Sequence, residues 1–424
     1  MIESIGRPLS LPAVSVPGIE NGRCNRCGAV VDSAVRDDRG RIYCRECLMF
    51  GLICEDSLLW RSEREVKRSG HVLKPGFSLS PAQEEASRFV CRCRWERQSG
   101  FLHAVCGAGK TEILYSALLE GLLEGWKIAI AIPRKDIVAE LTLRFRSVFP
   151  ETVVKAMHEG SKDDAGAHLV ISTIHQLIRY HREFDWIVLD EADAFPYRGD
   201  PLLHRLLKKA LKPQGTLFLM SATLNREMRG AIHRKEFRFF TLSARFHGHP
   251  LDIPRFVHVP DLSRELRSGR QLPSVIGAWL TRCRESGHRI LLFVPSVAYG
   301  KALGTLLGVL GFPAGVISSQ TPPADRVLDR FRGGEWQFLV TTTLLERGVT
   351  FSGIDVAVFS AEHPVFDADT LVQVAGRVGR DPRCPRGEII FFSEEKTQAM
   401  NQAVRAIRTM NTSSRKAGLL IDEM

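Results

Sequence analysis

The chain has 424 residues and a formal net charge of +10, and its length predicts two or three domains rather than one. The positive charge favours a polyanionic partner, because lysines and arginines that contact phosphates release counterions; a generally basic protein is the alternative. No apolar run approaches the roughly 20 residues that span a bilayer, and the first residues lack the apolar core of a secretory signal. We therefore expect a cytoplasmic protein without direct membrane insertion.

The cysteines are concentrated near the N-terminus, where five of the ten lie between residues 24 and 54. A disulfide framework is not expected in a large cytosolic protein. Two CxxC pairs separated by 16 residues are typical of a tetrahedral zinc site with four thiolate ligands. A redox-active CxxC pair is the alternative, but a second pair at this separation favours zinc. The predicted zinc ligands are Cys24, Cys27, Cys44 and Cys47.

From residue 76 onward, short apolar runs alternate with amphipathic stretches. This pattern predicts parallel strands covered on both faces by helices, and hence an α/β fold. The alternation pauses over residues 244–273, which hold four prolines, and then resumes, so we expect two lobes and a linker. The predicted divisions are a flexible N-terminal lead (1–20), the zinc module (21–56), a basic connector (57–75), the first lobe (76–243), the linker (244–273), the second lobe (274–412) and a tail (413–424).

The first lobe opens with a phosphate-binding pattern, GAGKT, that follows an apolar run and begins a helix. Its glycines let backbone N–H groups approach phosphates at a helix N-terminus. The lysine of a Walker A loop neutralises the β- and γ-phosphates, and the hydroxyl that follows it binds Mg²⁺. Ala104 replaces the first glycine of the general pattern. The predicted ATP-binding residues are Gly107, Ala108, Gly109, Lys110 and Thr111.

Two carboxylates end the apolar run FDWIVLDE, 80 residues after the loop lysine. Asp190 is the expected Mg²⁺ ligand, and Glu191 is placed to orient and deprotonate the attacking water. A solvated turn is the alternative, which the phosphate loop makes less favourable. Asp193 is expected to couple this site to neighbouring motifs.

The string QVAGRVGR at residues 373–380 lies at or just past the end of a predicted helix in the second lobe. If the helix persists, arginines three residues apart fall on nearly one face. Arg380, assisted by Arg377, is then the expected arginine finger, and Gln373, one turn earlier on the same side, is an expected nucleotide-binding residue. A merely solvated arginine-rich helix end is the alternative.

Together, AVCGAGKT, DEAD, SAT and QVAGRVGR resemble the motifs of superfamily 2 helicases. The resemblance implies two tandem RecA-like lobes over about residues 76–412, preceded by the zinc module, that hydrolyse ATP with Mg²⁺. It also implies that Gln83, in LSPAQEEA, reads adenine, with an ordinary surface glutamine as the alternative.

A closer resemblance, over about residues 21–400, is to the ComFA family of late competence proteins. It rests on the four cysteines and on the strings IPRKDIVAEL, TIHQLIRY, DEADAFPY and TTTLLERGVTF. The family resemblance implies a DNA-dependent ATPase that helps to draw transforming single-stranded DNA into the cytoplasm. Other competence proteins, including a membrane DNA channel, are the implied partners, and they would place the protein peripherally at the inner face of the cell membrane.

The resemblance also assigns roles by position, for which ordinary turn caps are the alternative. The implied nucleic-acid contacts are Pro133, Arg134, Thr173, His175, Thr342 and Thr343. The residues implied to couple hydrolysis to lobe motion are Ser221, Thr223, Glu346 and Arg347.

Three other functions stay open. A replication-restart helicase of the PriA kind also joins zinc to such lobes, although its cysteines usually lie within the helicase region. An RNA helicase is less favoured, because IPRKDIVAEL stands in place of a PTREL-like string and the last motif begins with Gln373 rather than His-Arg. An ATP-switched nucleic-acid-binding scaffold without translocation is the third.

Overall fold

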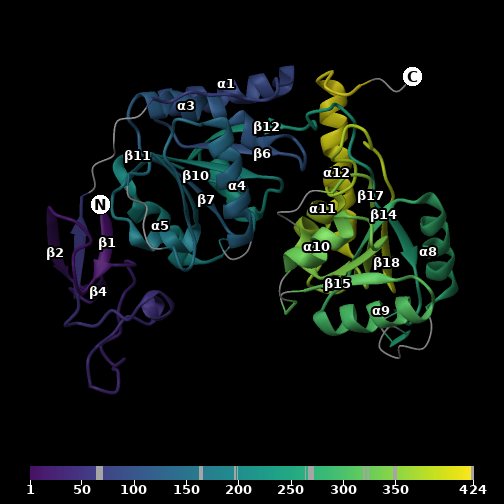
Figure 1. Cartoon of the computed structure of the whole chain (residues 1–424), viewed down its shortest axis with the longest axis horizontal. Helices are drawn as coiled ribbons and strands as arrows, with labels where there is room; N and C mark the ends of the chain where they lie inside the picture. The colour runs from purple at the N-terminus through teal and green to yellow at the C-terminus, as the bar shows by residue number, and fades with distance from the viewer. Residues whose placement is uncertain are drawn as a thin grey trace. The chain divides into compact units, whose positions relative to one another are not determined.

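The computed structural model describes residues 1–63, 70–161, 166–194, 197, 199–262, 264–265, 272–318, 320–321, 324–346 and 351–421 (Figure 1). It divides into two compact units. The first comprises Met1–His103 with Lys110–Thr241, and the second comprises Ala104–Gly109 with Leu242–Met424.

The first unit is built on a seven-stranded sheet with the strand order β12-β6-β11-β10-β7-β9-β8. Neighbouring strands from β6 to β8 pair in parallel, and the central strands are buried at nearly every position, as continuous apolar runs require. The strands are β6 (Gly100–Ala104), β7 (Ile128–Ile132), β8 (Val154–Met157), β9 (Leu169–Thr173), β10 (Phe184–Leu189), β11 (Leu211–Ser221) and β12 (Arg238–Leu242).

Helices cover this sheet, and several begin at recognisable caps. In the first of them, Ser80 and Gln83 form a capping box ahead of a proline at the first helical position. The helices of the unit are α1 (Pro81–Trp95), α2 (Lys110–Ile113), α3 (Tyr115–Leu123), α4 (Lys135–Val148), α5 (Pro201–Ala210) and α6 (Arg226–His233), with a 3-10 turn, η2 (Ile174–Arg179).

The second unit contains a six-stranded, all-parallel sheet with the order β13-β18-β17-β14-β16-β15. Its strands are β13 (Arg255–His258), β14 (Arg289–Phe293), β15 (Ala314–Ile317), β16 (Phe338–Thr341), β17 (Ile354–Phe359) and β18 (Ile389–Ser393). Its helices are α8 (Ser274–Ser286), α9 (Val297–Val309), α10 (Ala324–Arg332), α11 (Ala368–Ala375) and α12 (Gln398–Lys416), with the 3-10 turn η3 (Thr343–Glu346). The prediction of two parallel-sheet α/β lobes is confirmed.

The N-terminal segment differs from the flexible lead expected over residues 1–20. Strands β1 (Ile2–Ile5) and β2 (Ala13–Pro17) flank β5 (Leu58–Ser62) in a three-stranded antiparallel sheet. A short hairpin of β3 (Ile19–Glu20) and β4 (Arg23–Cys24) follows, and the 3-10 turn η1 (Arg45–Phe50) begins after Cys44 and contains Cys47. The sheet partner β5 lies in the expected basic connector, so lead and connector together frame the cysteine module.

Two further boundaries also differ from expectation. The linker expected over residues 244–273 contains β13, the edge strand of the second sheet. The tail expected from residue 413 begins inside α12, which continues to Lys416. Both segments have little apolar periodicity of their own, and their order comes from packing within the second unit.

Candidate functional site

Four buried thiols lie together in the N-terminal module, and this confirms the predicted four-cysteine cluster. Their sulfur atoms all lie within 4.8 Å of one another. A Zn–S bond of about 2.3 Å would place tetrahedral sulfur ligands about 3.8 Å apart. The Sγ atoms are separated by 3.6 Å between Cys24 and Cys47 and by 3.5 Å between Cys27 and Cys44. The residues present therefore fit a zinc ion.

Tight backbone turns bring each pair of thiols together. The N–H of Gly28 donates to the carbonyl of Cys24 at 2.8 Å, and the N–H of Cys47 donates to the carbonyl of Cys44 at 3.3 Å. Gly28 has φ +75°, a conformation that glycine adopts without steric cost. The glycine that follows the first CxxC pair thus has a geometric reason to be there.

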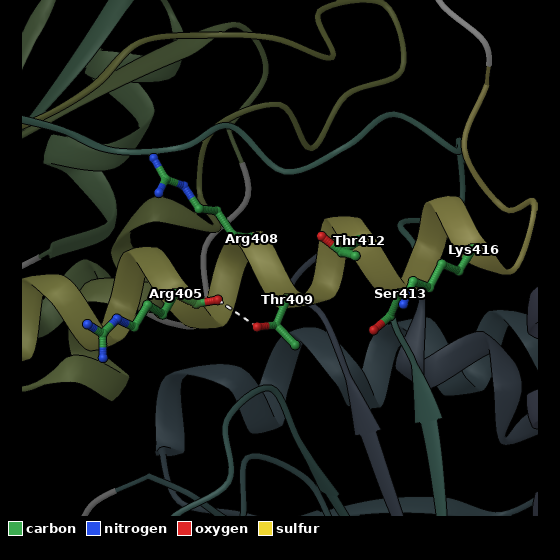
Figure 2. Close-up of a pocket in the computed structure, with 6 residues that line it drawn as sticks. All are labelled: Arg405, Arg408, Thr409, Thr412, Ser413 and Lys416. Atoms are coloured by element: carbon green, nitrogen blue, oxygen red, sulfur yellow. Dashed lines mark hydrogen bonds between the residues drawn. The ribbon is translucent and has the colours of Figure 1, made fainter.

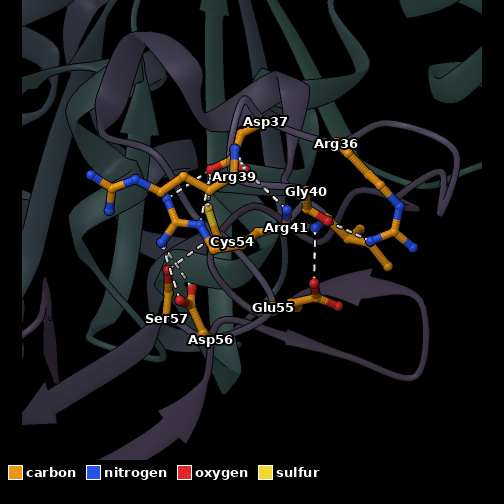
Figure 3. Close-up of polar contacts among 10 residues, drawn as sticks. Arg36, Asp37, Arg39, Gly40, Arg41, Cys54, Glu55, Asp56 and Ser57 are labelled. Atoms are coloured by element: carbon orange, nitrogen blue, oxygen red, sulfur yellow. Dashed lines mark hydrogen bonds and ion pairs between the residues drawn. The ribbon is translucent and has the colours of Figure 1, made fainter.

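The segment between the two pairs folds back in a hairpin whose tip is held by polar contacts (Figure 3). The Asp37 carboxylate accepts hydrogen bonds from the backbone of Arg39 at 3.0 Å and of Arg41 at 2.9 Å. The Arg41 guanidinium bridges Asp37, at 2.7 Å, to Asp56, at 3.1 Å. The remaining cysteine of this region, Cys54, is buried at the same tip and lies outside the metal cluster.

The cysteine module is joined to the first lobe by a largely buried lysine. Lys209, on α5, donates to the carbonyl of Arg26 at 2.7 Å and to the carbonyl of Ile178 at 2.8 Å, and it pairs with Glu3. The Glu3 side chain is fully buried and also binds Arg61 at 2.9 Å. Burial lowers the pKa of Lys209, and the nearby Glu3 charge opposes that shift. One ammonium therefore joins β1, the first cysteine turn and η2.

Further contacts tie the module to η2 and α5. Ile2 forms a β-bridge with Tyr180, and the ring of Phe50 stacks on His175 with centroids 5.9 Å apart. Arg205 donates to the carbonyl of Cys27 at 3.3 Å and pairs with Glu46. The implied nucleic-acid residue His175 therefore lies directly against the metal-binding module. Sequence patterns did not indicate this contact, because it joins segments more than 100 residues apart.

In the first lobe, the predicted functional residues follow the carboxyl ends of neighbouring parallel strands. Pro133 and Arg134 follow β7, His175 follows β9, and Asp190 follows β10. Since such ends meet at one edge of a parallel sheet, the topology brings these residues to a common edge. This is the edge where open α/β sheets bind their ligands.

The phosphate loop has the backbone that its glycines allow. Gly107 has φ +82° and Gly109 has φ +75°, and both conformations are strained for residues with a Cβ. The division between the two units falls inside this loop, and Lys110 and Thr111 begin α2 in the first unit.

The acidic motif is joined to the SAT motif by buried hydrogen bonds. The backbone N–H of Glu191 binds the Asp190 carboxylate at 2.8 Å, and Glu191 has φ +54°, an uncommon conformation for a residue with a side chain. The Thr223 hydroxyl donates to Asp193 at 2.6 Å, and the Thr223 N–H donates to the Ser221 hydroxyl at 3.1 Å. Hydrogen bonds therefore connect Asp193 directly to Thr223 and Ser221, the residues expected to couple hydrolysis to lobe motion.

His103, at the end of β6, also holds the SAT loop. Its Nε2 lies 3.2 Å from the carbonyl of Ala222, and its side chain is buried. Burial lowers the pKa of His103 to about 4, so the ring is neutral at physiological pH and its Nε2–H donates to that carbonyl. No sequence motif marks this histidine, because it lies within an apolar strand.

Gln83 is buried rather than on the surface, and it has a structural task. Only 5% of its side chain is exposed, and its Oε1 accepts from the Ser80 N–H at 2.9 Å in the capping box of α1. The structure thus excludes the surface alternative and adds helix capping to the implied adenine role.

In the second unit, α11 ends at Ala375, and Arg377 and Arg380 lie beyond it. Because the helix does not continue through them, the two arginines do not share a helix face. Arg377 is 1% exposed, and its Nε donates to the carbonyl of Glu346 at 3.0 Å. Arg380 is half-buried, and its Nε donates to the carbonyl of Gly376 at 3.0 Å. Arg380 is the more accessible of the two.

A buried arginine in the expected linker holds the loop of residues 376–380 that follows α11, which we call the arginine loop. Arg245 donates to the carbonyl of Gly379 at 2.7 Å and to that of Val378 at 2.6 Å. Burial lowers the pKa of Arg245 to about 10, which leaves it charged at neutral pH. Gln373, also buried, accepts from the Cys106 thiol at 3.1 Å within the same unit. No sequence pattern indicated Arg245, because its role depends on carbonyls distant in the chain.

The remaining predicted residues of the second lobe follow β16. Thr342 and Thr343 are half-buried, and the Thr342 hydroxyl accepts from the Leu344 N–H at 3.5 Å, as a turn cap does. Glu346 ends η3. Arg347 lies outside the described residues.

Comparison with known proteins places both lobes among helicases. Residues 76–226 match the type III restriction enzyme res subunit, and residues 271–382 match the helicase conserved C-terminal domain. A solved structure of S. cerevisiae Dbp5 bound to RNA and ADP BeF3 has a TM-score of 0.55 at 16% identity, covering 78% of this chain and 92% of that chain. It confirms the two-lobe RecA-like fold.

Two proteins of the same name are similar along most of the chain. Competence protein ComFA of Bacillus subtilis is 35% identical over 403 residues, covering 93% of this chain and 86% of that protein. Competence protein ComFA of Streptococcus pneumoniae is 33% identical over 399 residues, covering 93% and 91%.

Proposed function

We propose that this chain, which belongs to the ComFA family of competence proteins, is an ATP-driven translocase on single-stranded DNA. The chain is an ATP-dependent helicase of superfamily 2 by its two lobes and its family. The observation that carries the finer proposal is the cysteine module packed on η2, next to His175. The module would thereby extend the proposed nucleic-acid-binding edge of the first lobe.

The nucleotide site is proposed from the residues at that edge of the first lobe. Gly107, Ala108, Gly109 and Lys110 would hold the phosphates, and Thr111 with Asp190 would hold Mg²⁺. Mg²⁺, when bound, neutralises charge on the phosphates. Glu191 would orient the attacking water and take its proton. Gln83 would contact adenine, and Gln373 would lie near the nucleotide.

Arg380 is the proposed arginine finger, because it is more accessible than Arg377. Arg377 would instead position η3 through the carbonyl of Glu346, which couples the arginine loop to the Thr342 and Thr343 phosphate contacts. Arg347 would belong to the same coupling.

The strand track is proposed to be single-stranded DNA held mainly through its phosphates, without sequence preference. Pro133, Arg134, Thr173 and His175 would contact it in the first lobe. Each lobe would grip the strand differently in the ATP-bound and released states, so that hydrolysis advances the protein along it.

The ATPase rate on different nucleic acids tests this proposal. We expect stronger stimulation by single-stranded DNA than by duplex DNA or RNA, and no turnover in Lys110→Ala or Glu191→Gln. Stimulation by RNA alone would favour an RNA helicase, and turnover retained in either variant would refute the nucleotide site.

The metal of the cysteine cluster is proposed to be zinc, which four buried thiolates favour. Metal analysis of the purified chain should find one zinc ion. Cys24→Ser and Cys44→Ser should lose it, and an unchanged zinc content would contradict the assignment.

We also propose that the chain works beside other competence proteins, including a membrane DNA channel, at the inner face of the cell membrane. No helix among the described residues is long and apolar enough to cross a membrane. In this proposal the chain reaches the membrane through these partners. Fractionation of cells with and without the channel should show whether the chain follows it to the membrane.

A further inference from the structure

The last helix among the described residues carries several positive charges and no acidic residue of its own. Among its 19 residues, α12 has no aspartate or glutamate, and its four cations are Arg405, Arg408, Arg415 and Lys416. Within the described part of the chain, no carboxylate pairs with Arg405, Arg408 or Lys416. Some exposed arginines elsewhere do have such partners, as Arg330 has Glu335 and Arg383 has Asp381.

Three of these cations line one open depression together with three hydroxyl residues (Figure 2). At about 100° per residue, the six lie within roughly 140° of the helix circumference. The depression has a volume of about 470 Å³. Figure 2 shows Arg405 and Arg408 near one end of it and Lys416 at the other. We call this set the α12 stripe: Arg405, Arg408, Thr409, Thr412, Ser413 and Lys416.

The opposite face of α12 fixes the direction in which the stripe points. Met400, Ala403 and Ile407 are buried in the second unit. The Asn411 side chain exchanges two hydrogen bonds with the backbone of Leu251, at 2.9 and 2.8 Å. The helix is therefore held along this one face, and all six residues of the stripe on the other face are exposed.

The chemistry of the stripe suits a chain of phosphates. Arginine and lysine pair with phosphate oxygens, and serine and threonine hydroxyls donate to them. From Arg405 to Lys416 the helix rises about 16 Å, enough for successive phosphates of one strand. A membrane surface is a poorer match, because an interfacial helix must expose large apolar side chains, whereas those of α12 are buried, as in Met400 and Ile407, or half-buried, as in Val404 and Met410.

We propose that the α12 stripe binds the phosphate backbone of the single strand on which the protein acts. This inference rests on the proposed function and adds a contact surface beyond residues 271–382, where the helicase C-terminal match ends. It also assigns a role to the C-terminal helix, which contains none of the helicase motifs.

The test compares two triple variants of the full chain. In the first, Arg405, Arg408 and Lys416 are replaced by glutamine. In the matched control, Lys74, Lys235 and Lys301 are replaced by glutamine; each is exposed and lies outside the stripe. Binding of fluorescent oligo(dT) is measured between about 50 and 200 mM salt, with the ATPase rate as a function of oligo(dT) concentration.

We expect the stripe variant to lower the salt-dependence slope by about 2, at about 0.7 for each lost phosphate contact with a single strand. Half-saturation of the ATPase should need roughly tenfold more DNA, with the DNA-free ATPase rate unchanged and the control variant like the unmodified chain. Thermal unfolding of both variants verifies the fold.

An unchanged slope in the stripe variant would overturn the inference. So would a slope change of equal size in the control variant, since net charge would then explain it. Loss of binding to phosphatidylglycerol vesicles with oligo(dT) binding intact would overturn it in favour of a membrane. If the unmodified chain shows no stimulation by oligo(dT), the proposed function fails instead.

Discussion

At the scale of single residues, Gly379 shows how strongly the arginine loop depends on its backbone. It has φ +66°, and a Cβ there would lie 2.3 Å from the carbonyl oxygen of Pro385 and 2.6 Å from Nη1 of Arg245. Gly379→Ala should therefore destabilise the second unit by about 2–4 kcal/mol and lower the ATPase rate at least about tenfold. Thermal unfolding and steady-state ATPase assays measure both effects.

Gly277→Ala is the matched control, because a Cβ at Gly277 meets nothing within 4 Å and the residue lies inside α8. That change should leave activity intact and stabilise the helix by up to about 1 kcal/mol. If Gly379→Ala behaved like the control, the tight packing around the arginine loop would have no catalytic consequence.

Single residues were predictable where chemistry demands a residue type at a fixed spacing. The thiols, the loop lysine Lys110 and the carboxylates Asp190 and Glu191 are of this kind. Arg245 and His103 were not, because each acts on backbone carbonyls, and any residue has one. The different burial of Arg377 and Arg380 also depends on where α11 ends, which propensity sets only approximately.

At the scale of elements, the docking of the cysteine module on α5 and η2 predicts that the module supports nucleic-acid binding. Lys209→Met removes the ammonium that joins Glu3, Arg26 and Ile178. Breaking a buried ion pair costs about 3–5 kcal/mol when the other charge is left uncompensated, and we expect a smaller cost here because Glu3 keeps Arg61 as a partner. We expect a lower unfolding temperature and weaker oligo(dT) binding, since η2 carries His175.

Lys208→Met, on the exposed side of the same helix, is the control and should change neither property. The double variant Glu3→Gln with Lys209→Met should recover at most part of the lost stability, because it removes the buried carboxylate but also the ion-pair partner of Arg61. Weaker stability with unchanged oligo(dT) affinity would separate the module from strand binding.

Elements with strong periodicity were predicted, and short elements interrupted by prolines were missed. Strands β1 and β2 stand in a segment with several prolines, and β13 lies in a segment with four. Their order comes from pairing with β5 and β18, which are distant in the chain. The local sequence pattern carries no information on such pairing, so it predicts a flexible lead and a linker where these strands lie.

At the scale of the whole molecule, the alternation of apolar runs and helical stretches predicted two parallel sheets. This pattern does not predict the order of the strands within each sheet. The seven strands of the first sheet run in the order β12-β6-β11-β10-β7-β9-β8, and this order depends on which way each crossover turns. The consequence for function is that motifs far apart in sequence reach one sheet edge.

If the two lobes act as a motor, the chain should move along single-stranded DNA during ATP hydrolysis. Movement along the strand needs different affinities in different nucleotide states, and hydrolysis alone converts one state into the next. The intact chain should therefore displace streptavidin from biotinylated single-stranded DNA only while ATP turns over. Glu191→Gln should keep oligo(dT) affinity within about threefold, because it changes the base and no strand contact, yet should displace nothing. Full ATPase activity in the unmodified chain without displacement would instead identify an ATP-switched scaffold.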